Sequence, residues 1–158
     1  MRNDEKRSRL HTRLNELAPF VLAFSAGKDS AFLAKEASAA VGRNRFTAVF
    51  IDSALSSAHD HRRLEYFRKR MDLAVQVVRL DPFSEKEIVR NDPDRCYYCK
   101  RFLFGSLKRW MEKEKLPSRL IDGSTASDAA AYRPGARAAA ELGVVSPLQE
   151  AGFTSAEI

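Results

Sequence analysis

Apolar and amphipathic segments alternate along the chain. Mostly apolar runs at residues 20–24, 46–51 and 75–80 are each followed by polar or turn-forming residues, which is typical of buried parallel strands. A fourth strand is expected at 119–122. The segments between these runs carry apolar residues at helical spacing. We expect helices over 4–17, 29–42, 58–72, 84–91 (capped by Ser84), 96–115 and 134–142, a short extended piece at 144–148 and a helix start at 154–157.

This alternation predicts an α/β fold, specifically a three-layer, doubly wound, Rossmann-like parallel sheet with helices on both faces. The 158 residues are expected to form a single domain, 1–158, because no repeat or low-complexity linker divides them. Ligands of such sheets bind beyond the carboxyl ends of the strands, where the strand order changes direction. The loops after the first, second and fourth strands are therefore the expected site.

Composition adds less than the pattern does. Hydrophobic residues make up 44% of the chain and charged residues 30%, and no apolar run is long enough to cross a bilayer. We therefore expect a cytoplasmic protein with no membrane partner. The formal net charge of +6 suits a nucleotide or RNA, but basic and acidic residues are interleaved, which favours the interpretation that most of these charges form a solvated surface.

The loop after the first strand has the composition of a phosphate-binding turn. Gly27 lets backbone N–H groups approach phosphate oxygens, and the following helix adds unpaired donors at its N-terminus. Ser25 and Ser30 supply hydroxyl groups, Lys28 a cation, and Asp29 a carboxylate that can hold the Mg²⁺ of a pyrophosphate. The alternative interpretation is an ordinary strand–helix turn that contains serines.

The stretch Ser25-Ala26-Gly27-Lys28-Asp29-Ser30 resembles the S-G-G-x-D-S signature of the PP-loop ATP pyrophosphatases. These enzymes cleave ATP between the α- and β-phosphates and adenylate a substrate. The chain departs from the signature at Ala26, whose methyl group is expected to narrow the pyrophosphate site. The resemblance implies an adenine nucleotide alpha-hydrolase-like fold. It also implies that the loop after the second strand, with Asp52 and Ser53, receives the adenine.

Both cysteines of the chain lie in Cys96-Tyr97-Tyr98-Cys99. In a cytosolic protein, this spacing indicates metal binding or redox chemistry more than a structural disulfide. Two thiolates seldom complete a zinc or iron–sulfur site. The alternative is a reduced pair at the start of a helix, where the helix dipole would lower a thiol pKa.

The order of motifs after the phosphate loop resembles that of the LarE family of ATP-dependent sulfur transferases. The resemblance rests on four stretches, beginning with residues 91–100 around the cysteine pair. The others are Asp122-Gly123-Ser124-Thr125, Tyr132-Arg133-Pro134-Gly135 and residues 141–148.

It implies that ATP adenylates a carboxylate on a pyridinium mononucleotide, and that sulfur then displaces AMP. By the same resemblance, Cys96, Cys99 and Asp29 would be catalytic, and Gly123 and Arg133 would contact the nucleotide or substrate, although Arg133 also fits a surface charge.

The same resemblance implies further partners. ATP and Mg²⁺ would be required, with Asp29 as a metal ligand. Cys96 and Cys99 would ligate an iron–sulfur cluster if a third cysteine came from beyond residue 158. The chain is then expected to lack the family's C-terminal region and to form a homo-oligomer. The loop at 124–131 has fewer carboxylates than the D-G-T-N-A-D-D of the family, which weakens a substrate role there.

Two other functions remain open at this stage. PP-loop enzymes also thiolate tRNA or form amides, and the basic charge makes tRNA a candidate partner alongside a small carboxylate acceptor. Alternatively, the chain is a divergent module that binds ATP without turnover, as Ala26 and the altered loop at 124–131 would allow. All three functions require that the chain bind ATP.

Overall fold

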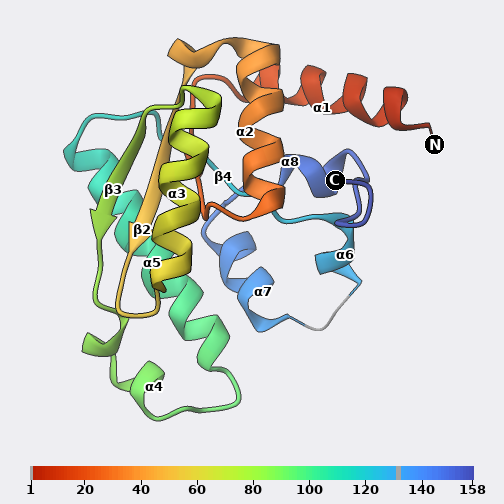
Figure 1. Ribbon diagram of the computed structural model, residues 1–158. Coiled ribbons are helices and arrows are strands. Elements are labelled where there is room, and N and C mark those ends of the chain that lie inside the picture. The colour runs from red at the N-terminus through yellow and green to blue at the C-terminus, as the bar shows by residue number, and fades with distance from the viewer. Residues whose placement is uncertain (1, 131–132) are drawn as a thin grey trace.

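A four-stranded parallel sheet in the order β3-β2-β1-β4 forms the centre of the computed structural model, which describes residues 2–130 and 133–158. β1 pairs in parallel with both β2 and β4, and β2 pairs in parallel with β3. Helices lie on both sides of the sheet (Figure 1), which confirms the predicted doubly wound α/β fold. The strands are β1 (Phe20–Ala23), β2 (Phe46–Asp52), β3 (Val75–Arg79) and β4 (Leu120–Ile121).

Each of the longer predicted helices is present, with ends that differ from the expected ones by at most two residues. None of the described helices is both long and apolar enough to cross a membrane. The helices are α1 (Asn3–Leu17), α2 (Lys28–Val41), α3 (Ala58–Met71), α4 (Lys86–Val89), α5 (Arg95–Lys113), α6 (Ala126–Ala129), α7 (Pro134–Glu141) and α8 (Pro147–Glu150), with the 3₁₀ turns η1 (Arg43–Arg45) and η2 (Pro82–Ser84).

The prediction that Ser84 caps a helix over 84–91 was wrong. The Ser84 hydroxyl donates to the Asp81 carbonyl at 2.7 Å, which places Ser84 at the end of η2. Helix α4 begins only at Lys86, with Glu85 as its N-cap. The proline at 82 starts a separate tight turn, and this turn uses the serine before the helix can.

Two elements predicted near the end of the chain also differ from the prediction. Residues 144–148 are not one extended piece, because Val145 forms an isolated parallel bridge with Ile121 and α8 then begins at Pro147. Residues 154–157 form a turn instead of the start of a helix. In that turn, the Thr154 amide and hydroxyl both donate to the Glu157 carboxylate at 2.8 Å.

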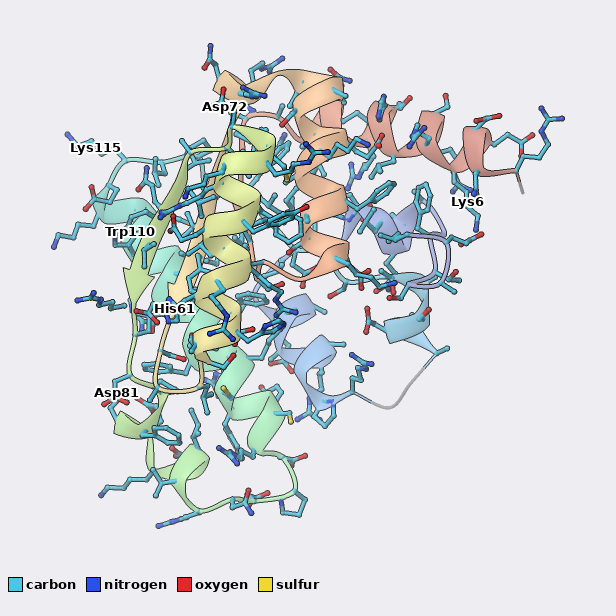
Figure 2. All side chains as sticks on the ribbon, viewed as in Figure 1. Lys6, His61, Asp72, Asp81, Trp110 and Lys115 are labelled. Carbon is cyan, nitrogen blue, oxygen red and sulfur yellow. The ribbon has the colours of Figure 1, made fainter. Side chains whose placement is uncertain are left out.

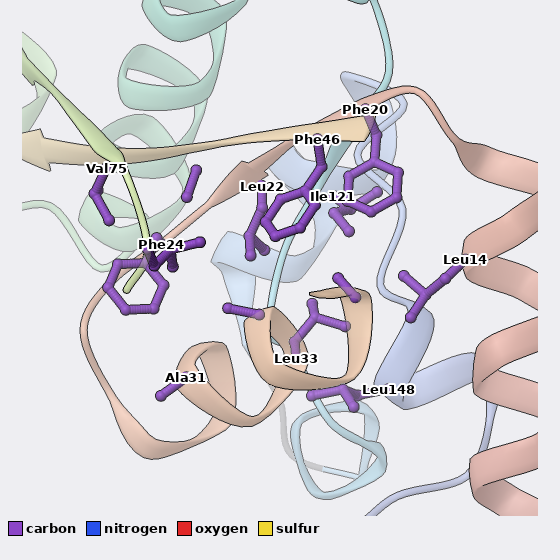
Figure 3. Packing of buried hydrophobic residues seen from close by; sticks show 14 of the residues in the cluster. Leu14, Phe20, Leu22, Phe24, Ala31, Leu33, Phe46, Val75, Ile121 and Leu148 are labelled. Carbon is purple, nitrogen blue, oxygen red and sulfur yellow. The ribbon is translucent and has the colours of Figure 1, made fainter. Parts of the chain in front are cut away.

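Alternation of side chains along the strands divides the core into two layers. Phe20 and Leu22 of β1 face the layer that contains α1, α2 and α3, whereas Val21 faces the layer with α5 and α7. Figure 3 shows the first layer, in which Leu14 and Leu33 pack toward the rings of Phe20 and Phe46. Burial on both faces explains why β1 reads as a continuous apolar run.

Candidate functional site

A cavity of about 500 Å³ opens at the carboxyl edge of the sheet. The chain runs from β1 outward to β2 and β3, then returns to place β4 on the other side of β1. Loops that leave neighbouring strands in opposite directions separate at such a switch point and leave room for a ligand. The cavity is lined by the ends of β1, β2 and β4 and by residues of α3 and α5, and its volume is typical of a small-molecule site.

The loop from β1 to α2 closes on itself through its serines. Ser25 Oγ lies 3.1 Å from Ser30 Oγ and accepts the Gly27 N–H at 3.3 Å, while Ser30 Oγ lies 3.1 Å from the Gly27 carbonyl oxygen. Gly27 is the N-cap of α2 and has no side chain to accept from the first turn. The amides of that turn therefore remain available to an anion, at the positive end of the helix dipole.

Ala26 does not line the cavity. Its backbone is left-handed, with φ of 58°, and its side chain is fully buried in the core layer of α1, α2 and α3. The methyl group that we expected to narrow the pyrophosphate site therefore points into the core. An alanine in this conformation costs about 1–2 kcal/mol relative to a right-handed one, which explains why glycine suits the position.

Lys28 and Asp29 both line the cavity and carry the charges of the loop. Lys28 Nζ lies 3.8 Å from Asp29 Oδ1, and the Asp29 side chain is 27% exposed. Within the described residues, no three His, Cys, Asp or Glu side chains are grouped so that they could hold a metal ion. Asp29 stays a predicted Mg²⁺ ligand. A Mg²⁺ ion held by one carboxylate completes its coordination with phosphate oxygens and water.

The loop after β2 also lines the cavity, through Ser53, Leu55 and Ser56. Asp52 does not line it. Its carboxylate lies 3.1 Å from His61 Nε2 and 3.6 Å from Arg79 Nε, so it joins α3 to the edge of the sheet. His61, which lies on α3 (Figure 2), is therefore within hydrogen-bonding distance of Asp52, a contact that its sequence context did not predict.

The loop after β4 reaches the cavity through Asp122, Gly123 and Ser124. Asp122 is buried and accepts from the Ser124 amide at 3.1 Å and from the hydroxyls of Ser124 and Ser146 at 2.9 and 2.7 Å. A β-carbon on Gly123 would come within 2.9 Å of the backbone nitrogen of Ser30. Gly123 therefore serves the site by letting this loop contact the phosphate loop directly.

Arg133 does not line the cavity but lies behind a residue that does. Its Nη1 is 2.6 Å from Oδ1 of Asp128, which lines the cavity from α6. The predicted contact of Arg133 with the nucleotide or substrate stays a prediction. Ala131 and Tyr132, which complete the altered loop and the Tyr-Arg-Pro-Gly stretch, lie outside the described residues.

Cys96 and Cys99 are free thiols in the first turns of α5, and neither lines the cavity. Cys96 is exposed and Cys99 is partly buried. Burial raises the pKa of the Cys99 thiol, and Arg95 and Lys100 offset this only in part. The alternative interpretation, in which a thiol at this helix start has a lowered pKa, therefore does not describe Cys99, whose pKa is raised by burial.

Three charged residues of the cavity wall were missed in the sequence. Lys100 lines the cavity from α5. It directly follows Cys99, so its place beside the cysteine motif was the sequence feature that could have predicted a role in the site. Asp60 and Arg63 line the cavity from α3 and pair at 2.6 Å. The pKa of Asp60 lies below its ordinary value because Ser57 and then Arg63 donate to it. Nothing in the charged pattern of α3 distinguished these two residues.

A parallel sheet of this order with a serine- and glycine-containing phosphate loop after β1 defines a PP-loop nucleotide-binding α/β protein. The sequence model of NAD synthase matches residues 7–93, which is more than half of the chain, and the chain belongs to this PP-loop family. It is 31% identical over 153 residues to the pyridinium-3,5-bisthiocarboxylic acid mononucleotide synthase of Lactiplantibacillus plantarum, covering 97% of this chain and 55% of that protein.

Solved structures share the fold at low sequence identity. The U34-tRNA thiolase of Methanococcus maripaludis, which carries a 4Fe–4S cluster, has a TM-score of 0.69 at 15% identity, covering 98% of this chain and 61% of that one. The NH₃-dependent NAD synthetase of Campylobacter jejuni has a TM-score of 0.62 at 14% identity, covering 82% and 59%. The chain spans about half the length of the curated relatives that it matches along nearly its whole length.

Proposed function

We propose that this chain binds ATP at the carboxyl edge of its sheet and cleaves it to AMP and pyrophosphate in order to activate a carboxylate for sulfur transfer. The observation that carries the proposal is the shared cavity. The phosphate loop lines one side of it, the loop after β2 lines another, and Lys100 adds a cation. The relative from Lactiplantibacillus plantarum, a synthase of a bisthiocarboxylic acid, supports sulfur transfer to a carboxylate as the outcome.

The proposed reaction needs positive charge around the polyphosphate. The first-turn amides of α2, Lys28 and Lys100 are the groups that would supply it. Mg²⁺ fits beside them, because Asp29 presents a partly exposed carboxylate at the cavity wall. When bound, the ion would neutralise charge on the pyrophosphate leaving group.

The chemistry balances in two displacements. A carboxylate oxygen of the acceptor attacks the α-phosphorus, the bond to the bridging oxygen of the β-phosphate breaks, and pyrophosphate leaves. Hydrosulfide (HS⁻), supplied as a co-reactant, then attacks the acyl carbon and AMP leaves with the former carboxylate oxygen, which gives a thiocarboxylate. Cys96 and Cys99 are the proposed sulfur-handling residues. They do not by themselves fit an iron–sulfur cluster, because such clusters are held by three or four ligands and this sequence has two cysteines.

The test is to incubate the chain with ATP, Mg²⁺, sodium sulfide and a carboxylated pyridinium mononucleotide and to separate the nucleotide products. We expect AMP and pyrophosphate in equal amounts. Asp29→Asn should reduce both, whereas Ser118→Ala, at an exposed position before β4, should not.

Release of ADP and phosphate would contradict cleavage between the α- and β-phosphates. ATP binding without any product would leave a nucleotide-binding module. A parallel reaction with tRNA in place of the mononucleotide identifies the acceptor. Products that form only with tRNA would move the proposal to tRNA thiolation.

A further inference from the structure

A turn far from the phosphate loop in sequence contacts both of its charged residues. Ser155 Oγ donates to the two carboxylate oxygens of Asp29, at 3.2 and 3.1 Å. The ammonium group of Lys28 donates to the Ser155 carbonyl oxygen. The Ser155 amide donates in turn to Oγ of Ser127, a residue of α6, at 3.1 Å. One residue therefore joins the phosphate loop to α6.

The position of Ser155 is fixed by its neighbours in the turn. Glu157 accepts from Thr154 and forms an ion pair with Lys6 of α1 at 2.6 Å. Figure 2 shows Lys6 pointing from α1 toward this turn. The Phe153 carbonyl oxygen accepts from the Ala126 amide of α6 at 2.7 Å. The centroid of the Phe153 ring lies 5.5 Å from that of the Phe32 ring on α2. Contacts to three helices thus hold the turn against the phosphate loop.

Ser155 contacts these charges from outside the cavity. Lys28 and Asp29 line the cavity, whereas Ser155 does not. A carboxylate has about four acceptor positions, so one hydroxyl shared between its two oxygens fixes its plane and leaves positions open on the other side. The lysine ammonium stands on a flexible four-carbon stem, and holding it at a carbonyl oxygen limits its pairing with the neighbouring carboxylate.

We propose that Ser155 is a positioning residue of the nucleotide site, which orients the Asp29 carboxylate toward the Mg²⁺ that accompanies ATP and holds Lys28 beside it. This role rests on the proposed function, because it assumes that ATP binds at the phosphate loop. This role makes the turn at 153–157 part of the site, although none of its residues lines the cavity.

The experiment is calorimetric titration of the chain with ATP, once with Mg²⁺ and once with EDTA. The proteins are the unaltered chain, Ser155→Ala, Ser155→Thr and Ser118→Ala as the matched control. Loss of a charge-assisted hydrogen bond to Asp29 should weaken Mg²⁺-dependent ATP binding on the order of tenfold in Ser155→Ala. Binding in EDTA should stay close to that of the unaltered chain. Ser155→Thr keeps the hydroxyl and should restore most of the affinity.

A purely structural role would lower affinity equally with Mg²⁺ and with EDTA, and that result would overturn the inference. Identical behaviour of Ser155→Ala and Ser118→Ala would also overturn it, while leaving the proposed function intact. If the unaltered chain bound no ATP, both would fail. A Mg²⁺-specific loss in a chain that binds ATP but releases no pyrophosphate would support the role of Ser155 and contradict only the proposed turnover.

Discussion

Gly123 and Ser30 lie so close together that a β-carbon on Gly123 would stand 2.9 Å from the Ser30 backbone nitrogen and 3.0 Å from its α-carbon. Ser30 belongs to the first turn of α2, and Gly123 follows β4. The contact is between two backbones, so no side chain can move aside to relieve a clash. Two of the loops that line the cavity are thus held together at a point where only glycine fits.

Gly123→Ala should therefore disturb the site as well as the fold. We expect the unfolding free energy to fall by about 1–3 kcal/mol, as for other overpacked positions, and ATP affinity to fall with it because the phosphate loop must shift. Urea unfolding and calorimetry measure the two effects.

Gly105→Ala is the matched control for this substitution. Gly105 lies within α5, and the nearest atom to its added β-carbon is a side-chain nitrogen of Arg109 at 3.7 Å. Alanine at a helical position should raise stability by up to about 1 kcal/mol. If the two variants behaved alike, the close approach at Gly123 would not matter.

Ala26 allows a test of the left-handed turn in the phosphate loop. Ala26→Gly relieves about 1–2 kcal/mol of backbone strain, but it loses a buried methyl group worth about 0.8 kcal/mol and adds freedom to the unfolded chain. We therefore expect a net change in unfolding free energy within about 1 kcal/mol, and little change in ATP affinity.

Ala26→Val should behave differently, because a β-branched residue is a poor fit to a φ of 58° in a fully buried position. Its unfolding free energy should fall by more than about 2 kcal/mol. Urea unfolding compares the two variants, and a valine that the loop accepted without cost would contradict the left-handed geometry.

The ion pair between Lys6 and Glu157 predicts a pH dependence. Donation by Lys6, and then by Thr154, holds the pKa of Glu157 at about 2, below its ordinary value of 4.5. The stabilisation is therefore fully present above pH 4.5 and is lost as the pH falls through about 2. Glu157→Gln should be less stable than the unaltered chain at neutral pH, and the two unfolding curves should converge in strong acid.

Urea unfolding across this pH range checks the prediction. Glu112→Gln, at an exposed position of α5, supplies the comparison for loss of a surface carboxylate. A stability gap between Glu157→Gln and the unaltered chain that stayed constant down to pH 2 would show that the carboxylate is not paired as described.

The two cysteines should differ in reactivity with iodoacetamide. Cys96 is exposed, whereas Cys99 is partly buried and burial raises its thiol pKa above the ordinary value of 9. Because the thiolate is the nucleophile, Cys99 should react more slowly at neutral pH, and its rate should still rise above pH 9. Mass spectrometry on Cys96→Ser and Cys99→Ser separates the two rates. Faster alkylation of Cys99 at neutral pH would contradict its burial.

The sequence by itself determined the fold class and the place in the fold of the candidate site. Most residues of the central strands β1 and β2 are buried, so their apolar runs are clear in the sequence. Gly42 and Pro134 mark helix ends through local backbone chemistry. The phosphate loop was visible for the same reason, because its residues are contiguous between a strand and a helix. The predicted residues Ser25, Gly27, Lys28, Asp29 and Ser30 all line the cavity.

Only the tertiary structure decided which distant residues join that loop. It placed Asp52 and Arg133 outside the cavity wall, brought Arg63 and Lys100 into it, and set Ser155 against Asp29. These relations depend on how helices pack on the sheet and on where a late turn returns to α2. Local periodicity and motif spacing carry no information about either, because they describe neighbours along the chain and not across it.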